Sequence, residues 1–281
     1  MRTFLDCYPC FLRQGLDAAR HAGADEALQE KIMQKSLLLL AEAHPDSRPP
    51  EISAVLHRMV RAETGNNDAY QELKKASTQE ALEMLPWLQQ VIHGSADPLE
   101  TALRLSAAGN IIDFGAAREF DLQAVIREVL IAQFAIYHLQ EFRQDLANAS
   151  FVLYLADNAG ETVFDRLLIE QLGKPVYYAV KTTPIINDAI REDAVSAGVD
   201  KVATIIETGL DIPGADPQNS TPEFKRLFQE ADLIISKGQG NYEMLSENEE
   251  PLYFLLRAKC AIIARDLQVP VGSFILKKAG Q

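Results

Sequence analysis

The second half of the chain alternates short apolar runs, rich in β-forming residues, with stretches long enough for a helix. Alternating β and α elements predict a parallel, Rossmann-like α/β sheet with helices on both faces. The expected strands are residues 151–156, 175–181, 202–207, 233–236, 252–256 and 273–276. Ligands of open α/β sheets bind outside the carboxyl ends of the strands, so polar residues that directly follow these runs are the first site candidates.

The first part of the chain has the periodicity of helices instead. Apolar residues recur at helical spacing through residues 28–37, 52–60 and 81–92. We therefore predict an all-helical N-terminal domain over residues 1–105 and an α/β domain, which binds metal and phosphate, over residues 106–281.

Composition limits the classes of partner. The 281 residues are 47% hydrophobic and 24% charged, as in globular proteins, and the net charge is −13. This charge, with no cluster of Lys or Arg, argues against nucleic acid. No apolar run reaches the roughly 18 residues of a membrane span. Without a signal-peptide pattern, and with an odd number of cysteines, we expect a cytoplasmic protein; the oligomeric state stays open.

Two polar clusters follow neighbouring predicted strands. Asp157 and Asn158 come directly after residues 151–156, and Glu161 follows them. Asp188 follows the strand at 175–181, and adjacent parallel strands end about 5 Å apart. Oxygen ligands of this kind suit Mg²⁺ or Mn²⁺. The alternative is that these residues only cap the helices that come next.

Two glycine-containing segments form the next candidates. In the first, Lys237, Gly238, Gly240 and Asn241 follow the strand at 233–236. Glycines let backbone N–H groups turn toward an anion, and a following helix N-terminus adds its dipole, so this loop is a candidate phosphate cradle. A plain loop is the alternative.

The second of these segments lies between Gly109 and Gly115 and contains Asn110 and Asp113. A helix that Asp97 caps, with Pro98 as its first residue, is expected to end at Gly109. Asn110 and Asp113 could orient a substrate, or they could only satisfy backbone groups in a connection between helices.

The remaining candidates are thiols and one lysine. Cys7 and Cys10 stand one helical turn apart and with Cys260 could form a metal site, a redox pair with a third thiol, or packed buried sulfurs. Packing is the interpretation we favour. Lys181 could reach a substrate, but a solvated lysine at the end of a strand is the simpler expectation.

Together these segments resemble the damage-control phosphatases, catalogued as domain of unknown function 89, in the branch with an N-terminal Cys-x-x-Cys. One departure is Ala69, where the family pattern has Pro. The matching segments, in order, are residues 7–10, 64–70, 108–115, 157–161, 184–189, 236–243 and 255–260.

The resemblance implies a metal-dependent phosphoric monoester hydrolase acting on small phosphorylated metabolites, such as sugar phosphates or damaged cofactor precursors. It implies Asp157, Asn158 and Asp188 as ligands of Mn²⁺, Co²⁺, Ni²⁺ or Mg²⁺, with Lys237 holding the phosphate. The resemblance thus implies that the three metal ligands and Lys237 are catalytic residues.

The phosphate contacts and the nucleophile follow from this metal chemistry. Substrate and phosphate contacts are expected from Asn110, Asp113, Glu161, Lys237, Gly238, Gly240 and Asn241. We expect metal-activated water as nucleophile, with direct attack by Asp157 as the alternative. A non-catalytic sensor of a phosphorylated metabolite is the second candidate function, and a methyltransferase is the third.

Overall fold

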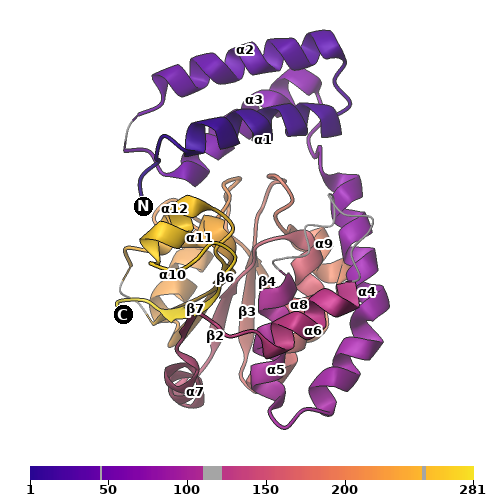
Figure 1. Cartoon of the computed structure of the whole chain (residues 1–281), viewed down its shortest axis with the longest axis vertical. Coiled ribbons are helices and arrows are strands. Elements are labelled where there is room, and N and C mark those ends of the chain that lie inside the picture. The colour runs from indigo at the N-terminus through magenta and orange to yellow at the C-terminus, as the bar shows by residue number, and fades with distance from the viewer. Residues whose placement is uncertain (45, 110–121, 249–250) are drawn as a thin grey trace.

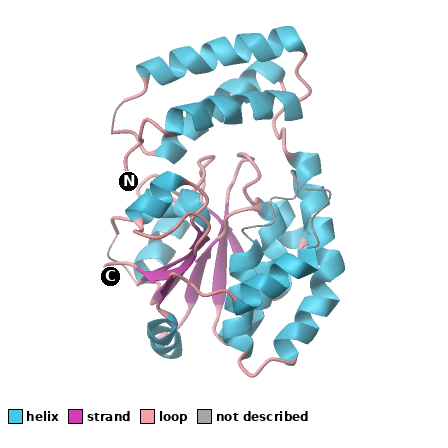
Figure 2. Cartoon of the chain, viewed as in Figure 1, coloured by secondary structure: helices cyan, strands magenta, loops and turns pink. Residues whose placement is uncertain are grey.

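The computed structural model describes residues 1–44, 46–109, 122–248 and 251–281. In these ranges the centre is a seven-stranded sheet (Figure 2). The strands run across the sheet in the order β1 (Ile136–Tyr137), β7 (Phe274–Lys278), β6 (Leu252–Arg257), β5 (Leu233–Lys237), β2 (Val152–Leu155), β3 (Val176–Val180) and β4 (Thr204–Glu207). The predicted α/β class and all six predicted strands are confirmed, and the two-residue β1 is an addition.

One pair in the sheet departs from the predicted parallel arrangement. β7 runs antiparallel to β6, whereas the other neighbouring pairs are parallel. The helix between them, α12 (Ala261–Asp266), has six residues and spans only about 9 Å. It cannot carry the chain back along a strand of about 20 Å. The chain therefore enters β7 at the end where β6 finishes.

Helices cover both faces of the sheet (Figure 1). One face packs against α4 (Gln71–His93), α5 (Pro98–Gly109), α6 (Leu122–Ile131), α7 (Leu139–Asn148), α8 (Thr162–Leu172) and α9 (Arg191–Ser196). The other packs against α10 (Pro222–Glu230), α11 (Gly238–Leu245) and α12. Side chains of β2 alternate between these cores, Val152 and Tyr154 toward the first and Leu153 and Leu155 toward the second. This double burial explains why the strand is apolar throughout.

Three helices form a separate layer across one end of the sheet (Figure 1). They are α1 (Cys7–His21), α2 (Glu26–Glu42) and α3 (Pro49–Thr64), and we call them the roof. α4 leaves the roof and shares its apolar core with the sheet, as does α5. The predicted boundary near residue 105 thus falls within the helices that cover the sheet.

Two further expectations concern helices. Asp97 caps α5 as predicted, because its Oδ1 accepts the N–H of Glu100 at 3.1 Å. In the described ranges, no helix combines the length and the apolar character needed to cross a bilayer.

Candidate active site

Asp157, Asn158 and Asp188 meet at the carboxyl ends of β2 and β3. Asn158 and Asp188 face each other across an isolated β-bridge. The N–H of Ala159 donates to the carbonyl of Asn187 at 2.8 Å, and the N–H of Ala189 donates to the carbonyl of Asp157 at 2.8 Å. These backbone bonds join the two loops, so the three predicted metal ligands form one cluster.

The helix-cap alternative is wrong for Asn158 and Asp188. Asn158 precedes the 3-10 turn Ala159–Glu161, yet its side chain makes no capping hydrogen bond. At α9 the carboxylate that accepts the N–H of Ile190, at 3.0 Å, belongs to Asp193 and not to Asp188. Capping of a helix therefore does not explain the side chains of Asn158 and Asp188 at the strand ends.

The donor set fits a hard divalent cation. Asn158 Nδ2 donates to Asp157 Oδ2 at 3.0 Å and to Glu161 Oε1 at 2.6 Å, which leaves the amide oxygen as the ligating atom. Asp188 is 4% exposed. No hydrogen bond from a described residue reaches its Oδ2, although Lys181 Nζ forms an ion pair with this oxygen at 3.6 Å. An ion pair longer than a hydrogen bond compensates a buried carboxylate oxygen only in part, and a bound metal cation would complete that compensation. No three His, Cys, Asp or Glu of the described ranges form a ligand group by themselves, so the fit requires the amide oxygen.

The electrostatics of the cluster point the same way. Burial raises the pKa of Asp157 well above its usual range, and the nearby Glu161 and Asp188 add to this effect. Burial also raises the pKa of Asp188 to about 6, although Lys181 works against it. Both shifts show that negative charge is disfavoured here, and a bound cation would relieve that penalty.

The glycines after β5 bring backbone against the cluster. Gly238 has φ +76°, and a Cβ at this position would lie 1.8 Å from Asp157 Oδ2. Gly240 approaches the backbone of Pro213 and Gly214, and a Cβ on Gly214 would lie 2.4 Å from the Gly240 carbonyl oxygen. Only glycine allows these approaches. The loop 210–222 is therefore held directly against the start of α11.

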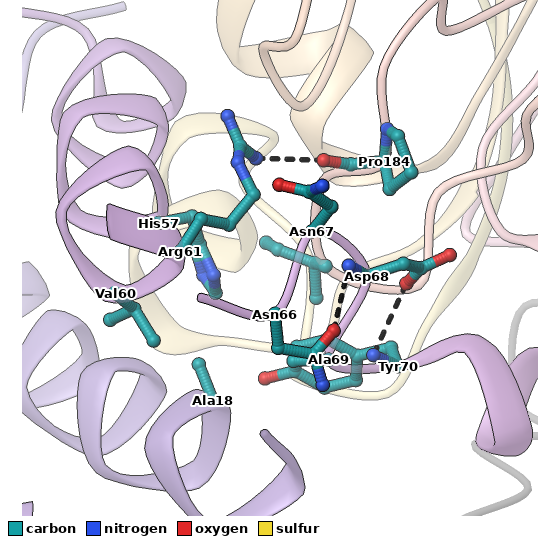
Figure 3. Close-up of a pocket in the computed structure, with 11 residues that line it drawn as sticks. Ala18, His57, Val60, Arg61, Asn66, Asn67, Asp68, Ala69, Tyr70 and Pro184 are labelled. Carbon is teal, nitrogen blue, oxygen red and sulfur yellow. Dashed lines mark hydrogen bonds between the residues drawn. The ribbon is translucent and has the colours of Figure 1, made fainter. Parts of the chain in front are cut away.

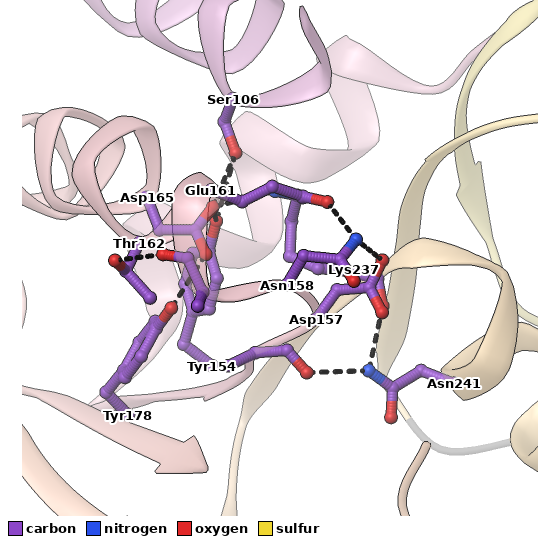
Figure 4. A network of polar contacts seen from close by, with 12 residues as sticks. Ser106, Tyr154, Asp157, Asn158, Glu161, Thr162, Asp165, Tyr178, Lys237 and Asn241 are labelled. Atoms are coloured by element: carbon purple, nitrogen blue, oxygen red, sulfur yellow. Dashed lines mark hydrogen bonds and ion pairs between the residues drawn. The ribbon is translucent and has the colours of Figure 1, made fainter. Parts of the chain in front are cut away.

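Lys237 and Asn241 do not face the open site. Lys237 is fully buried, and its Nζ donates to Glu161 Oε2 at 2.8 Å and to Asp165 Oδ1 at 2.7 Å (Figure 4). Asn241 is 1% exposed, and its Nδ2 donates to the carbonyls of Ala156 at 3.1 Å and Lys237 at 2.7 Å. This geometry does not favour the expectation that these two side chains contact phosphate, because the atoms that could donate to it, Lys237 Nζ and Asn241 Nδ2, donate to internal partners.

A cavity of about 440 Å³ lies between the metal-type cluster and the roof. The floor of the cavity includes Asp157, Asn158, Asp188, Gln239, Gly240 and Glu243. On the side of the roof it is lined by Asp6, Cys7, Cys10, Phe11, Gln14, Pro49, Pro50 and Ser53. Lys259 and Cys260 complete one side. Among the lining residues that the structure describes, Lys259 is the cation, and it is exposed.

Lys259 is the residue that the sequence reasoning missed. It stands two residues after the end of β6. Asp157, which the sequence singled out, likewise stands two residues after the end of β2. Its backbone N–H donates to Gln239 Oε1 in the loop after β5. The rule for strand ends, applied to this strand too, would have identified it.

Two expectations on burial are corrected. Lys181 is 3% exposed rather than solvated, because the loop 210–222 covers it and the Gly214 carbonyl accepts its Nζ at 2.6 Å. The three cysteines are free thiols that line the cavity, with Cys10 exposed and Cys7 and Cys260 half-buried. Packing as buried sulfurs is therefore wrong for Cys10. Asn110 and Asp113 lie outside the described residues.

A second cavity, of about 20 Å³, separates the roof from the loop that carries Asp188 (Figure 3). It has room for about one water molecule. His57 lines it and is 4% exposed, and no described residue makes a hydrogen bond to its Nε2. Burial lowers the pKa of His57 to about 4, so the ring is neutral at neutral pH.

The turn 64–70, one of the segments that carry the family resemblance, forms the opposite wall of this second cavity. Asn66 Oδ1 accepts the N–H of Asp68 at 3.0 Å, and Asp68 Oδ1 accepts the N–H of Tyr70 at 3.2 Å (Figure 3). This segment thus shapes the junction between the roof and the Asp188 loop.

Fold and site define an α/β protein with an oxygen-donor cluster at the carboxyl edge of a mostly parallel sheet, closed by a helical roof. The chain belongs to the family of the damage-control phosphatase ARMT1-like domain, whose model matches residues 3–275. This confirms the family resemblance drawn from the sequence.

Individual relatives match over nearly the whole chain. An uncharacterised protein of Methanocaldococcus jannaschii is 35% identical over 97% of this chain and 94% of its own. A damage-control phosphatase of Pyrococcus horikoshii is 34% identical over 98% of this chain and 97% of its own. A crystal structure of a DUF89 family protein from the same archaeon has a TM-score of 0.92 and 32% identity, with 99% of each chain covered.

Proposed function

We propose that this protein is a metal-dependent phosphatase that hydrolyses small phosphorylated metabolites. The observation that carries the proposal is the convergence of Asp157, Asn158 and Asp188 below an open cavity, with Asp188 Oδ2 lacking a hydrogen-bond donor among the described residues. The family, and relatives named damage-control phosphatases, support it. Phosphoric monoesters, including sugar phosphates and damaged cofactor precursors, are the proposed substrates.

Asp157, Asn158 and Asp188 would hold the cation, which we propose is Mn²⁺, Co²⁺, Ni²⁺ or Mg²⁺. When bound, such an ion neutralises charge on the phosphoryl oxygens and lowers the pKa of water. Glu161 keeps the amide of Asn158 turned so that its oxygen faces the cluster, because Glu161 Oε1 accepts Nδ2. The chain thus supplies two carboxylates and one oriented amide.

Lys259 is the side chain that we propose binds the phosphate. Its charge opposes the rise in the pKa of Asp157 and contributes to the lowered pKa of Glu161, and Lys259 lines the same cavity as Asp157 and Asn158. Gly238, Gln239 and Gly240 begin α11, and the first N–H groups of a helix lack partners within the helix. Ammonium and backbone N–H groups together would bind phosphoryl oxygens.

Water rather than Asp157 is the proposed nucleophile. Asp157 Oδ2 already accepts a hydrogen bond from Asn158, and the backbone of Gly238 closes on the same carboxylate, leaving no space there even for a Cβ. An attacking carboxylate would need freedom to approach phosphorus in line. The same confinement suits a fixed ligand.

The rest of the substrate would lie against the roof. Gln14 and Ser53 line that part of the cavity and bond to each other, with Ser53 Oγ donating to Gln14 Oε1 at 3.0 Å. Glu243 lines the floor beneath them. Neutral polar groups and carboxylates suit hydroxyl-bearing leaving groups such as sugars.

The test is hydrolysis of p-nitrophenyl phosphate after chelation and then with Mn²⁺, Co²⁺, Ni²⁺ or Mg²⁺ restored. Asp157→Asn should abolish the restored activity. Asp232→Asn is the matched control, because Asp232 is exposed at the opposite end of β5 and accepts the backbone N–H of Ser150 at 2.8 Å, away from the cavity. No turnover of this ester or of a sugar-phosphate panel with any metal would contradict the proposal and favour a binding protein.

A further inference from the structure

Asp165 is a buried carboxylate surrounded by four donors (Figure 4). Its Oδ1 accepts the hydroxyl of Ser106 at 3.0 Å, the hydroxyl of Tyr154 at 2.7 Å and Lys237 Nζ at 2.7 Å. Its Oδ2 accepts the hydroxyl of Tyr178 at 2.8 Å. These side chains come from α5, α8, β2, β3 and β5. None of them lines the cavity in the described structure.

The four donors compensate the buried charge of Asp165. Burial, with the Asp165 charge added, raises the pKa of Tyr154 and of Tyr178 well above the usual value, so both remain hydroxyl donors. A buried ion pair contributes little to stability compared with apolar residues of the same shape. Stability alone therefore does not explain why a carboxylate and an ammonium occupy this part of the core.

The ammonium that Asp165 holds leads directly to the metal-type cluster. Lys237 Nζ also donates to Glu161 Oε2 at 2.8 Å. Glu161 Oε1 accepts Asn158 Nδ2 at 2.6 Å, and the same amide nitrogen donates to Asp157 Oδ2 at 3.0 Å. Glu161 thus links the Lys237 ammonium to the Asn158 amide through its two carboxylate oxygens.

We propose that Asp165 is a positioning residue for the metal site, acting through Lys237 and Glu161 to fix the Asn158 amide with its oxygen toward the cation. The inference rests on the proposed metal-dependent function and assigns Lys237 an internal role in it. Without Asp165, Lys237 keeps Glu161 as its one carboxylate partner. The ammonium is then no longer fixed from the other side, and Glu161 loses the fixed position of the cation that orients it. Groups that orient a ligand in this way typically change metal affinity by about 10–100-fold when removed.

The test is the dissociation constant for Mn²⁺, followed from the electron paramagnetic resonance signal of free Mn²⁺, which requires no turnover. Asp165→Asn should bind Mn²⁺ about 10–100-fold more weakly than the wild type. Asp145→Asn is the matched control, because Asp145 accepts the same donor types, the Tyr253 hydroxyl at 2.6 Å and Lys278 Nζ at 2.6 Å, at the other end of the sheet. This control should lower thermal stability and leave Mn²⁺ affinity unchanged.

A double-mutant cycle separates positioning from general weakening of the core. If Asp165 acts through Glu161, the losses in Asp165→Asn and Glu161→Gln should not add in the double variant. Additive losses, or wild-type affinity in Asp165→Asn, would overturn the inference while leaving the phosphatase proposal intact. A wild-type chain that binds no metal would overturn both.

A milder variant covers the case in which Asp165→Asn does not fold. Tyr178→Phe removes one of the four donors to Asp165 and changes no charge. Its affinity for Mn²⁺ should fall several-fold, and wild-type affinity in this folded variant would then overturn the inference.

Discussion

Gly238 offers the most direct test of the site geometry. In Gly238→Ala the new Cβ would lie 1.8 Å from Asp157 Oδ2, whereas real Cβ contacts of this kind essentially never fall below 3.0 Å. The carboxylate would have to move by about 1.2 Å, or the loop after β5 would have to open by the same amount. A displacement of about 1 Å in a catalytic group costs on the order of 10²-fold in rate.

The backbone conformation of Gly238 adds a cost in stability to the Gly238→Ala variant. This cost must be separated from the effect of the clash with Asp157. Gly238 has φ +76°, and a residue with a Cβ pays about 1–2 kcal/mol in that region. Gly173 at the end of α8 has φ +64°, and a Cβ added there would meet no heavy atom within 4 Å. Gly173→Ala therefore pays the same backbone cost without touching the site.

The assay compares the two variants in kcat/KM for p-nitrophenyl phosphate with restored metal, in Mn²⁺ affinity and in urea unfolding. Both should lose about 1–2 kcal/mol of unfolding free energy. Only Gly238→Ala should lose about 10²-fold in kcat/KM. If its kcat/KM and Mn²⁺ affinity stayed within about twofold of Gly173→Ala, the carboxylate beside Gly238 would not be a ligand, and the reasoning on the site would be refuted.

Charge and burial lead to three further predictions. Lys259→Ala should raise KM for phosphate esters by about 10–100-fold, the range of a lost charged hydrogen bond, with Mn²⁺ affinity nearly unchanged; a wild-type KM would show that another group binds the phosphate. Burial lowers the pKa of His57 to about 4, so the unfolded chain binds this proton first, and stability should fall as pH drops from about 6.5 to about 4, by up to roughly 3 kcal/mol. Urea unfolding of His57→Leu should lack this part of the pH dependence. The carboxylates of Asp6 and Glu243 line the cavity and would repel a negatively charged leaving group. Glucose 6-phosphate should therefore be hydrolysed faster than 6-phosphogluconate, which carries an additional carboxylate. Burial raises the pKa of Glu243 to about 7, so this preference should grow above pH 7 and shrink in Glu243→Gln.

The rule for strand ends accounts for most of what the sequence could predict. Asp157 and Asp188 follow apolar runs that become β2 and β3, and parallel pairing alone brings such positions together. The same periodicity places Lys237 on one face with Leu233 and Ile235, whose side chains pack in the core that includes α8. Both faces of this sheet are covered, however, so periodicity does not reveal whether a lysine meets the cavity or the core.

The remaining errors come from contacts between residues far apart in the chain. Lys237 pairs with Asp165, 72 positions earlier, and Lys181 is covered by Gly214, 33 positions later. No local pattern of residues encodes such partners. The antiparallel β7 was missed for a related reason, since strand direction depends on whether the connecting helix is long enough to return along the sheet.

The division between roof and floor implies that separate parts of the chain determine catalysis and substrate preference. The metal-type cluster belongs wholly to loops after β2 and β3, whereas α1 and α3 supply the opposite wall of the cavity. The roof joins the floor through polar contacts of three arginines. Arg61 donates to the Pro184 carbonyl at 2.8 Å and to Asp211 at 2.6 Å, Arg58 pairs with the same Asp211, and Arg48 pairs with Asp216 at 3.6 Å. A chimaera that takes residues 1–64 from a relative and keeps this seam should therefore exchange the preference for the leaving group while the hydrolytic machinery stays the same.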